Sequence, residues 1–255
     1  MKNSSAIYPS LAGRHIFITG GSSGIGGDMV AAFARQGARV SFVGRSASSA
    51  EKVVRACEGA AVQPHFIPVD LADVDALRAA FGEAIERSGD LDVLVNNAAN
   101  DERHAFLEVT PEYFDQRVAI NLKAHFFAAQ AALPSMRRRG GGSVINVGST
   151  SWKLKGAGYA AYATCKSAAT GLTRSLAREF GPDSIRVNTL TPGWVMTERQ
   201  LDRWVDEAGE RAMDENHCLP GRILGSDVAD LALFLAADES RMITAQEFVI
   251  DAGWT

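Results

Sequence analysis

Short runs of apolar and β-branched residues alternate along the chain with longer segments in which apolar residues recur every three or four positions. The short runs predict strands at residues 15–19, 40–43, 62–69, 91–95, 143–147, 185–190 and 247–250. The longer segments predict helices at residues 25–36, 46–58, 73–88, 111–139 and 159–180. Because strands that alternate with helices of this length form βαβ units, we expect an α/β fold: a seven-stranded parallel sheet with helices on both faces.

The composition is that of one ordinary globular domain. The 255 residues suffice for a large α/β domain, and no stretch rich in Pro, Gly or Ser divides the chain, so we expect residues 1–255 to form a single domain. Residues 197–222 are the least regular, and we expect them to form a lid. The net charge of −4 argues against nucleic-acid or membrane partners. The start of the chain lacks a secretory pattern, and three scattered cysteines predict neither disulfides nor a metal site, which favours the cytoplasm.

A glycine-rich turn follows the first predicted strand. Gly20, Gly24 and Gly26 have the spacing G-x-x-x-G-x-G and precede a predicted helix. Glycines allow a tight turn and a close approach of the backbone, and a helix N-terminus offers free N–H groups to a pyrophosphate. A glycine-rich turn without a ligand is the alternative, and the position between a strand and a helix argues against it.

Candidate catalytic residues follow the later strands. Tyr162 and Lys166 are four residues apart, on one face of a predicted helix. A nearby cation favours the phenolate form of tyrosine and makes it a usable general base. Ser149 and Asn97 follow the ends of the fifth and fourth predicted strands, the edge at which parallel sheets bind ligands. The Tyr–Lys pair alone is weak evidence, since such pairs are common on solvated helix faces.

Taken together, these motifs resemble the classical short-chain dehydrogenase/reductases in order and spacing over nearly the whole chain. They are Thr19-Gly20-x-x-x-Gly24-x-Gly26, Asn96-Asn97-Ala98-Ala99, Asn121, Ser149, Tyr162-x-x-x-Lys166 and Pro192-Gly193. One departure is Ala99, where the family usually has Gly. The resemblance implies a Rossmann-type, doubly wound fold, a nicotinamide cofactor, and a homotetramer formed through the two long helices.

The resemblance also implies roles for individual residues. Tyr162 would exchange a proton with the substrate. Lys166 would hold the nicotinamide ribose and lower the pKa of Tyr162. Ser149 would bind the reacting oxygen, and Asn121 would support a proton path through water. The implied cofactor contacts are Gly20, Ser22, Ser23, Gly24, Ile25, Gly26, Gly44, Arg45, Ser46, Asp70, Leu71, Asn97, Ala98, Ala99, Tyr162, Lys166, Pro192, Gly193, Val195 and Thr197.

A narrower resemblance concerns the substrate. Residues 4–11, 96–104, 140–152 and 250–254 look like bacterial aldose 1-dehydrogenases of the D-xylose type, which oxidise C1 of a sugar to the lactone. The implied substrate contacts are Asn100, Ser149, Trp152, Tyr162 and Trp194. The polar run at 100–104 suits a polyol, although a solvated loop is the simpler interpretation, and tryptophans are more often core residues.

Two other functions stay open. One is an NADPH-dependent reductase of another carbonyl, such as a 3-oxoacyl thioester or a cyclic ketone. The other is a redox sensor that only binds the nucleotide; the complete tetrad argues against it, because a sensor needs no base.

The end of the second strand bears on the cofactor. A carboxylate that binds the adenosine ribose is expected about 20 residues beyond the glycine turn, and Gly44 occupies that place. Arg45 offers a planar fork to a 2′-phosphate, and Ser46 adds a hydroxyl. Basic residues are lacking at Ser22 and Ser23, which weakens the argument. We therefore expect NADP to be preferred and NAD to be tolerated.

Overall fold

The computed structural model describes residues 6–255 of the chain. Residues 1–5 of the expected domain, and with them residues 4 and 5 of the stretch 4–11, lie outside the described residues.

Seven parallel strands form one sheet, as predicted. They are β1 (His15–Thr19), β2 (Arg39–Gly44), β3 (His65–Pro68), β4 (Val93–Asn96), β5 (Gly142–Val147), β6 (Ile185–Pro192) and β7 (Glu247–Ile250). Their order across the sheet is β3-β2-β1-β4-β5-β6-β7. The order reverses between β1 and β4, and doubly wound sheets bind ligands beyond the strand ends at such a reversal.

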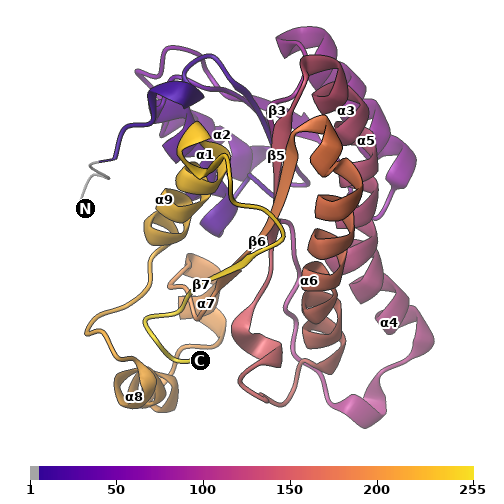
Figure 1. Ribbon diagram of the computed structural model, residues 1–255. Coiled ribbons are helices and arrows are strands. Elements are labelled where there is room, and N and C mark those ends of the chain that lie inside the picture. The colour runs from indigo at the N-terminus through magenta and orange to yellow at the C-terminus, as the bar shows by residue number, and fades with distance from the viewer. Residues whose placement is uncertain (1–5) are drawn as a thin grey trace.

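Helices cover both faces of the sheet (Figure 1). One face carries α1 (Gly24–Arg35), α2 (Ala47–Arg55) and α9 (Gly225–Ala236), and the other carries α3 (Val74–Ser88), α4 (Pro111–Val118), α5 (Ala124–Arg139) and α6 (Ala160–Phe180). Side chains alternate between the two faces of a sheet along a strand, so successive residues of β1 pack in the two hydrophobic cores alternately. Ile16 and Ile18 pack in the core that contains α1 and α9, whereas Phe17 packs in the core that contains α3 and α5.

The secondary structure differs from the elements expected from the sequence at several places. Residues 197–222 contain two short helices, α7 (Glu198–Arg203) and α8 (Glu207–Asn216), capped by the side chains of Thr197 and Asp206. Helix α9 was not predicted: it is rich in apolar residues, and only Ser226, Asp227 and Asp230 mark its less buried face. Strand β3 begins at His65 and not at residue 62; Pro64, just before it, has no N–H to donate to the neighbouring strand.

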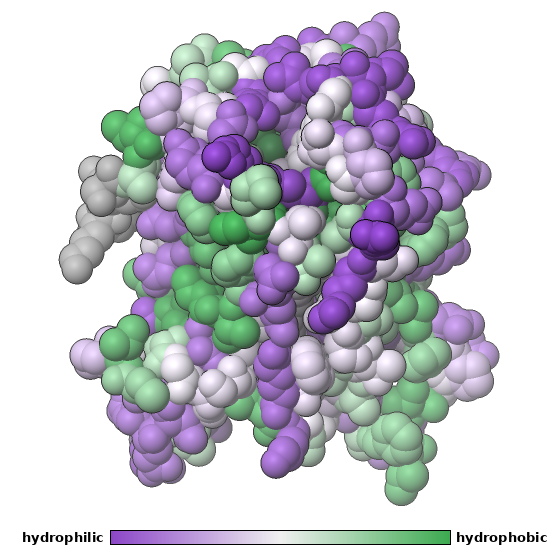
Figure 2. Space-filling model, viewed as in Figure 1, coloured by the Kyte–Doolittle hydropathy of each residue, from purple (hydrophilic) through white to green (hydrophobic). Residues whose placement is uncertain are grey.

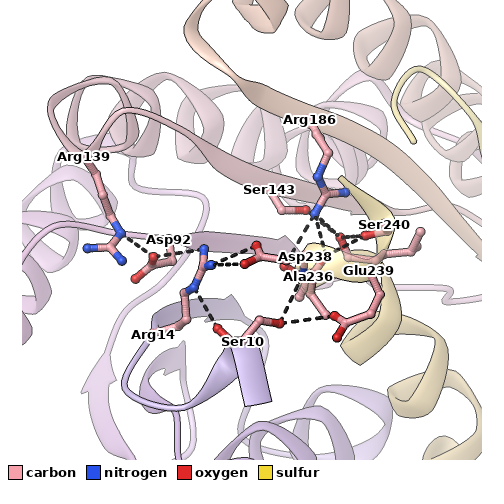
Figure 3. A network of polar contacts seen from close by, with 12 residues as sticks. Ser10, Arg14, Asp92, Arg139, Ser143, Arg186, Ala236, Asp238, Glu239 and Ser240 are labelled. Carbon is pink, nitrogen blue, oxygen red and sulfur yellow. Dashed lines mark hydrogen bonds and ion pairs between the residues drawn. The ribbon is translucent and has the colours of Figure 1, made fainter. Parts of the chain in front are cut away.

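A network of charged side chains lies at the amino ends of the strands, away from the edge where ligands bind (Figure 3). Asp92 is buried at its centre and accepts the backbone N–H of His15 at 2.7 Å. Its other oxygen pairs with Arg14 at 3.4 Å and with Arg139. Arg186 donates to the carbonyl of Leu235 at 2.8 Å, and burial lowers its pKa to about 10. Hydrophilic side chains gather at this upper end of the molecule in Figure 2.

Replacing Asp92 by Ala is expected to destabilise the protein by about 1–3 kcal/mol, because it leaves the buried N–H of His15 without an acceptor and removes a carboxylate partner from Arg14 and Arg139. Urea unfolding at one protein concentration measures the loss. The matched control is Glu51→Ala, which removes an exposed ion pair with Arg55 and is expected to cost less than about 1 kcal/mol. Equal losses in the two variants would contradict the importance of the network.

Candidate active site

The glycine-rich turn joins β1 to α1 and is held by β4. Gly20 and Gly24 have positive φ angles of 69° and 54°. A Cβ on Gly26 would lie 2.1 Å from the carbonyl oxygen of Gly20. The side-chain amide of Asn97 donates to the carbonyls of Thr19 and Gly20 at 3.0 and 3.2 Å. The predicted glycine spacing therefore has a steric reason in this fold.

A groove of about 780 Å³ runs along this turn. The predicted cofactor residues that line it are Gly20, Ser22, Ser23, Gly24, Ile25, Gly26, Gly44, Arg45, Asp70, Leu71, Asn97, Ala98, Ala99 and Thr197. Helix α1 starts at this groove without a side-chain cap, so its N-terminal N–H groups remain available to an anion. The groove thus fits a dinucleotide, whose pyrophosphate needs such donors.

Six predicted cofactor residues do not line the groove: Tyr162, Pro192, Gly193 and Val195 line the cavity described below, and Ser46 and Lys166 line neither. One cation that does line the groove was missed. The hydroxyl of Ser46 caps α2 and accepts the N–H of Ser49 at 3.2 Å. Lys52, on the same helix, lines the groove together with Arg45. The sequence carried no signal for Lys52, because its place depends on how α2 packs beside β2.

Three of the four predicted catalytic residues meet beyond the end of β5. Ser149 directly follows the strand, and Tyr162 and Lys166 lie in the first turns of α6. The ammonium of Lys166 is buried, lies 5.9 Å from the centre of the Tyr162 ring, and donates to the carbonyl of Val147 at 2.7 Å. Lys166 is therefore anchored to β5.

Burial controls the ionisation of this pair. It raises the pKa of Tyr162 above its usual value, and a hydrogen bond with Ser149 acts in the opposite direction. Burial also lowers the pKa of Lys166 to about 8. Although Lys166 is nearby, the protein groups alone leave the pKa of Tyr162 raised, because desolvation is the largest influence on it.

Asn121 lies in a π-helical turn, Ala119–Lys123, which interrupts the helix predicted over residues 111–139. Its side chain accepts the N–H of Asn100 at 2.7 Å and donates to the carbonyl of Asn100 at 3.1 Å. One turn later, His125 bonds the carbonyl of Ala98 at 2.8 Å, and burial lowers its pKa to about 3, so the ring is neutral. Such turns occur frequently at functional sites, and here the π turn fixes the backbone that follows β4.

A second cavity of about 470 Å³ adjoins the groove at Ile25, Ala99, Asp101 and Thr197, which line both. The predicted residues that line it are Ser149, Tyr162, Pro192, Gly193, Trp194, Val195 and Thr197. Asn100, predicted to contact substrate, lines the groove instead. Trp152, also expected to contact the substrate, is not among the residues that line this cavity; it is 39% exposed, and Lys153 Nζ lies 4.9 Å from the centre of its ring.

Several residues of this cavity were not singled out from the sequence. They are Thr150, Ser151, Leu154, Gly156, Tyr159, Gln200, Ala212 and Trp254, whereas Asp101 and Arg103 belong to the polar run at 100–104 that the sequence analysis noted as suiting a polyol. Trp254 reaches the cavity because the chain end folds back: the carboxylate of Asp251 accepts the N–H groups of Gly253 and Thr255 at 2.9 and 2.8 Å. The stretch 250–254 was recognised by resemblance, but nothing local indicated where its tryptophan points.

The parallel sheet, the dinucleotide groove, and the Ser149, Tyr162 and Lys166 side chains at its end define an oxidoreductase that uses a nicotinamide nucleotide. The chain belongs to the short-chain dehydrogenase/reductase family. A family model described as "Enoyl-(Acyl carrier protein) reductase" matches residues 20–255.

Two relatives are similar over nearly their full length. The D-xylose 1-dehydrogenase of Caulobacter vibrioides is 46% identical over 251 residues, which cover 98% of this chain and 99% of the relative. The probable galactose dehydrogenase of Rhizobium meliloti is 46% identical over 253 residues, covering 98% of each chain. Among solved structures, a blue fluorescent protein from a metagenomic library, in complex with NADPH, superposes with a TM-score of 0.88 at 36% identity, covering 96% of this chain and 99% of the other.

Proposed function

We propose that this protein is an NAD(P)-dependent aldose 1-dehydrogenase, which oxidises C1 of a sugar to the aldonolactone. The observation that carries the proposal is the 46% identity to two sugar dehydrogenases, over almost the whole length of each chain. The cavity beside Tyr162 supports it, because Asp101, Gln200 and Ser151 give it the polar lining that a polyol requires.

Within this proposal, Tyr162 takes the proton of the anomeric hydroxyl as that bond breaks. Ser149, hydrogen-bonded to the phenol, binds the reacting oxygen and orients it. The oxidised nicotinamide, when bound, supplies the acceptor for the C1 hydride and a positive charge that favours the phenolate. Lys166, whose ammonium donates to the carbonyl of Val147, would hold the nicotinamide ribose, and Asn121 would support a proton path through water.

The residues of the groove would hold the cofactor. The pyrophosphate would lie on the turn from Gly20 to Gly26, and Asp70 beside the adenine. We propose NADP as the preferred cofactor and NAD as a tolerated one, because Gly44 brings no carboxylate to this end of the groove and Arg45 and Lys52 bring two cations.

The expected assembly and compartment are also proposals. A homotetramer through α4, α5 and α6 is supported by the exposed rings of Phe114 and Phe126 on the first two helices, which are 42% and 49% accessible. Between residues 6 and 255, the structure contains no helix with the length and apolar character needed to cross a membrane. A cytoplasmic location rests on the cysteines, which are free thiols at Cys57, Cys165 and Cys218.

A reductase of an acyl thioester or another carbonyl is the second candidate function. The observation in its favour is the description of the matching family model as an "Enoyl-(Acyl carrier protein) reductase", a name that also refers to an acyl thioester, although to its C=C bond and not to a carbonyl. The redox-sensor alternative is disfavoured, since a protein that only binds nucleotide has no use for Tyr162 beside the groove.

Absorbance at the reduced-nicotinamide band tests the proposal, with NADP⁺ and NAD⁺ each offered against pentoses, hexoses and deoxyhexoses. We expect reduction of the cofactor with at least one aldose, and a higher kcat/KM with NADP⁺. If no aldose is oxidised while NADPH is consumed with a 3-oxoacyl thioester or a cyclic ketone, the second candidate replaces the first.

A further inference from the structure

Helix α7 is tied to the loop after β4 by a set of polar contacts across the mouth of the site. The two oxygens of Asp101 are held separately: Arg199 Nε lies 3.1 Å from Oδ1, and Gln200 Nε2 donates to Oδ2 at 2.6 Å. The neighbouring Glu102 pairs with Arg199 at 3.1 Å and with Arg203 at 3.2 Å. The carboxylates of Asp101 and Glu102 therefore both bind side chains of helix α7.

The two carboxylates differ in where they lie. Asp101 lines both the groove and the cavity, whereas Glu102 lines neither. Gln200 also lines the cavity and accepts the indole N–H of Trp194 at 2.9 Å. Asp101, Gln200 and Trp194 thus form a connected polar wall inside the cavity, and Glu102 supports the same helix from outside.

Asp101 lines the same cavity as Ser149 and Tyr162. Its negative charge contributes to the raised pKa of Tyr162 and acts against the lowering of the pKa of Lys166. Tyr162 is also influenced by Tyr159, which lines the same cavity, and by its hydrogen bond with Ser149. A carboxylate in reach of these groups is in reach of the substrate that Tyr162 serves.

A carboxylate is an acceptor only, with about four lone-pair directions. Arg199 and Gln200 each use one direction on a different oxygen, so acceptor capacity remains on both oxygens. Hydroxyl groups on neighbouring sugar carbons can donate to the two oxygens together. A ketone or thioester without hydroxyls can donate nothing, and a site built to bind hydroxyls rejects analogues that lack them.

We infer that Asp101 is the residue that selects a polyhydroxylated substrate, by accepting hydrogen bonds from sugar hydroxyls away from the reacting carbon, while Arg199 and Gln200 hold its carboxylate in place. This inference rests on the proposed function. It adds a determinant that would separate sugars from the acyl thioesters and simple ketones of the second candidate.

The test compares Asp101→Asn with Glu102→Gln. Both substitutions remove a negative charge that faces α7, but only the first changes the cavity. We expect D101N to lower kcat/KM for the best aldose about 10- to 100-fold, as for a lost hydrogen bond to a charged group. We expect E102Q to change it less than about 3-fold, in line with a half-exposed ion pair. Titration of NADP⁺ checks that D101N does not act through the groove.

Monodeoxy analogues of the same aldose identify the contact. In the wild-type enzyme, an analogue that lacks the hydroxyl bound by Asp101 should have a kcat/KM about 10-fold or more below that of the aldose. In D101N, the same analogue should lower kcat/KM much less, because the carboxylate that accepts from this hydroxyl has already been replaced. Equal kinetic losses in D101N and E102Q, or deoxy penalties that are the same in wild type and D101N, would overturn the inference.

A measurement of sugar binding distinguishes a failure of this inference from a failure of the proposed function. If the wild-type protein oxidises no aldose, quenching of fluorescence from Trp194 and Trp254, which line the cavity, is measured with the same sugars. Quenching that is present in wild type and E102Q but lost in D101N would support Asp101 as a hydroxyl-binding residue without the dehydrogenase. Absence of any sugar-dependent quenching would overturn both.

Discussion

Tyr162→Phe is expected to lower kcat by about 10²- to 10⁴-fold, the usual contribution of a positioned acid–base group. The phenol is buried at the junction of α6 and the end of β5, and hydrogen-bonds with Ser149. The substitution removes only the hydroxyl, so NADP⁺ should bind with unchanged affinity. Steady-state kinetics with the best aldose, together with a titration of cofactor binding, measure the two effects.

The matched control is Tyr159→Phe. Tyr159 lines the same cavity three residues earlier and is the N-cap residue of α6. Removing its hydroxyl should lower kcat less than about 10-fold, since it is not hydrogen-bonded to Ser149 as the Tyr162 phenol is. If dehydrogenase activity survives Tyr162→Phe unchanged, or if both variants lose the same activity, Tyr162 is not the base.

Gly44→Asp is expected to lower the ratio of kcat/KM for NADP⁺ to that for NAD⁺ by about 100-fold or more. Gly44 is the last residue of β2 and lines the groove beside Arg45. A carboxylate there would repel a 2′-phosphate at short range, where like charges near a surface cost up to about 4 kcal/mol, and would accept the ribose hydroxyls of NAD.

Gly44→Ala is the control for the steric part of this change. A Cβ at Gly44 would lie 2.5 Å from the hydroxyl oxygen of Ser22, which must rotate away in both variants. The alanine variant therefore carries the same Cβ without the charge, and should change the cofactor ratio less than about 3-fold. If the ratio of kcat/KM for NADP⁺ to that for NAD⁺ falls equally in the two variants, or does not fall in Gly44→Asp, the end of β2 gives no support for a preference for NADP.

Much of the site was predictable because its elements carry local chemistry. The strands are short apolar runs, and Gly20, Gly24 and Gly26 mark a turn whose backbone requires them. Ser149 and Asn97 could be placed at one edge, because strand ends in a parallel sheet share that edge, whereas Tyr162 and Lys166, which lie in a helix, were assigned to the site through the family resemblance. Helix α9 was missed because Leu231 and Phe234 stand on its less buried face beside its few polar residues, which weakens the polar contrast that reveals a helical period.

The sequence by itself determined the sheet, the glycine turn and the candidate catalytic residues, since periodicity and turn chemistry depend on residues close together in the chain. Only the tertiary structure decided which distant groups meet. Asp101 and Gln200 are 99 positions apart and form one hydrogen-bonded wall, while Trp152, expected at the substrate, is not among the residues that line the cavity. The tertiary structure also decided ionisation: burial raises the pKa of Tyr162 although Lys166 is nearby, because the cost of desolvation depends on packing that no local pattern records.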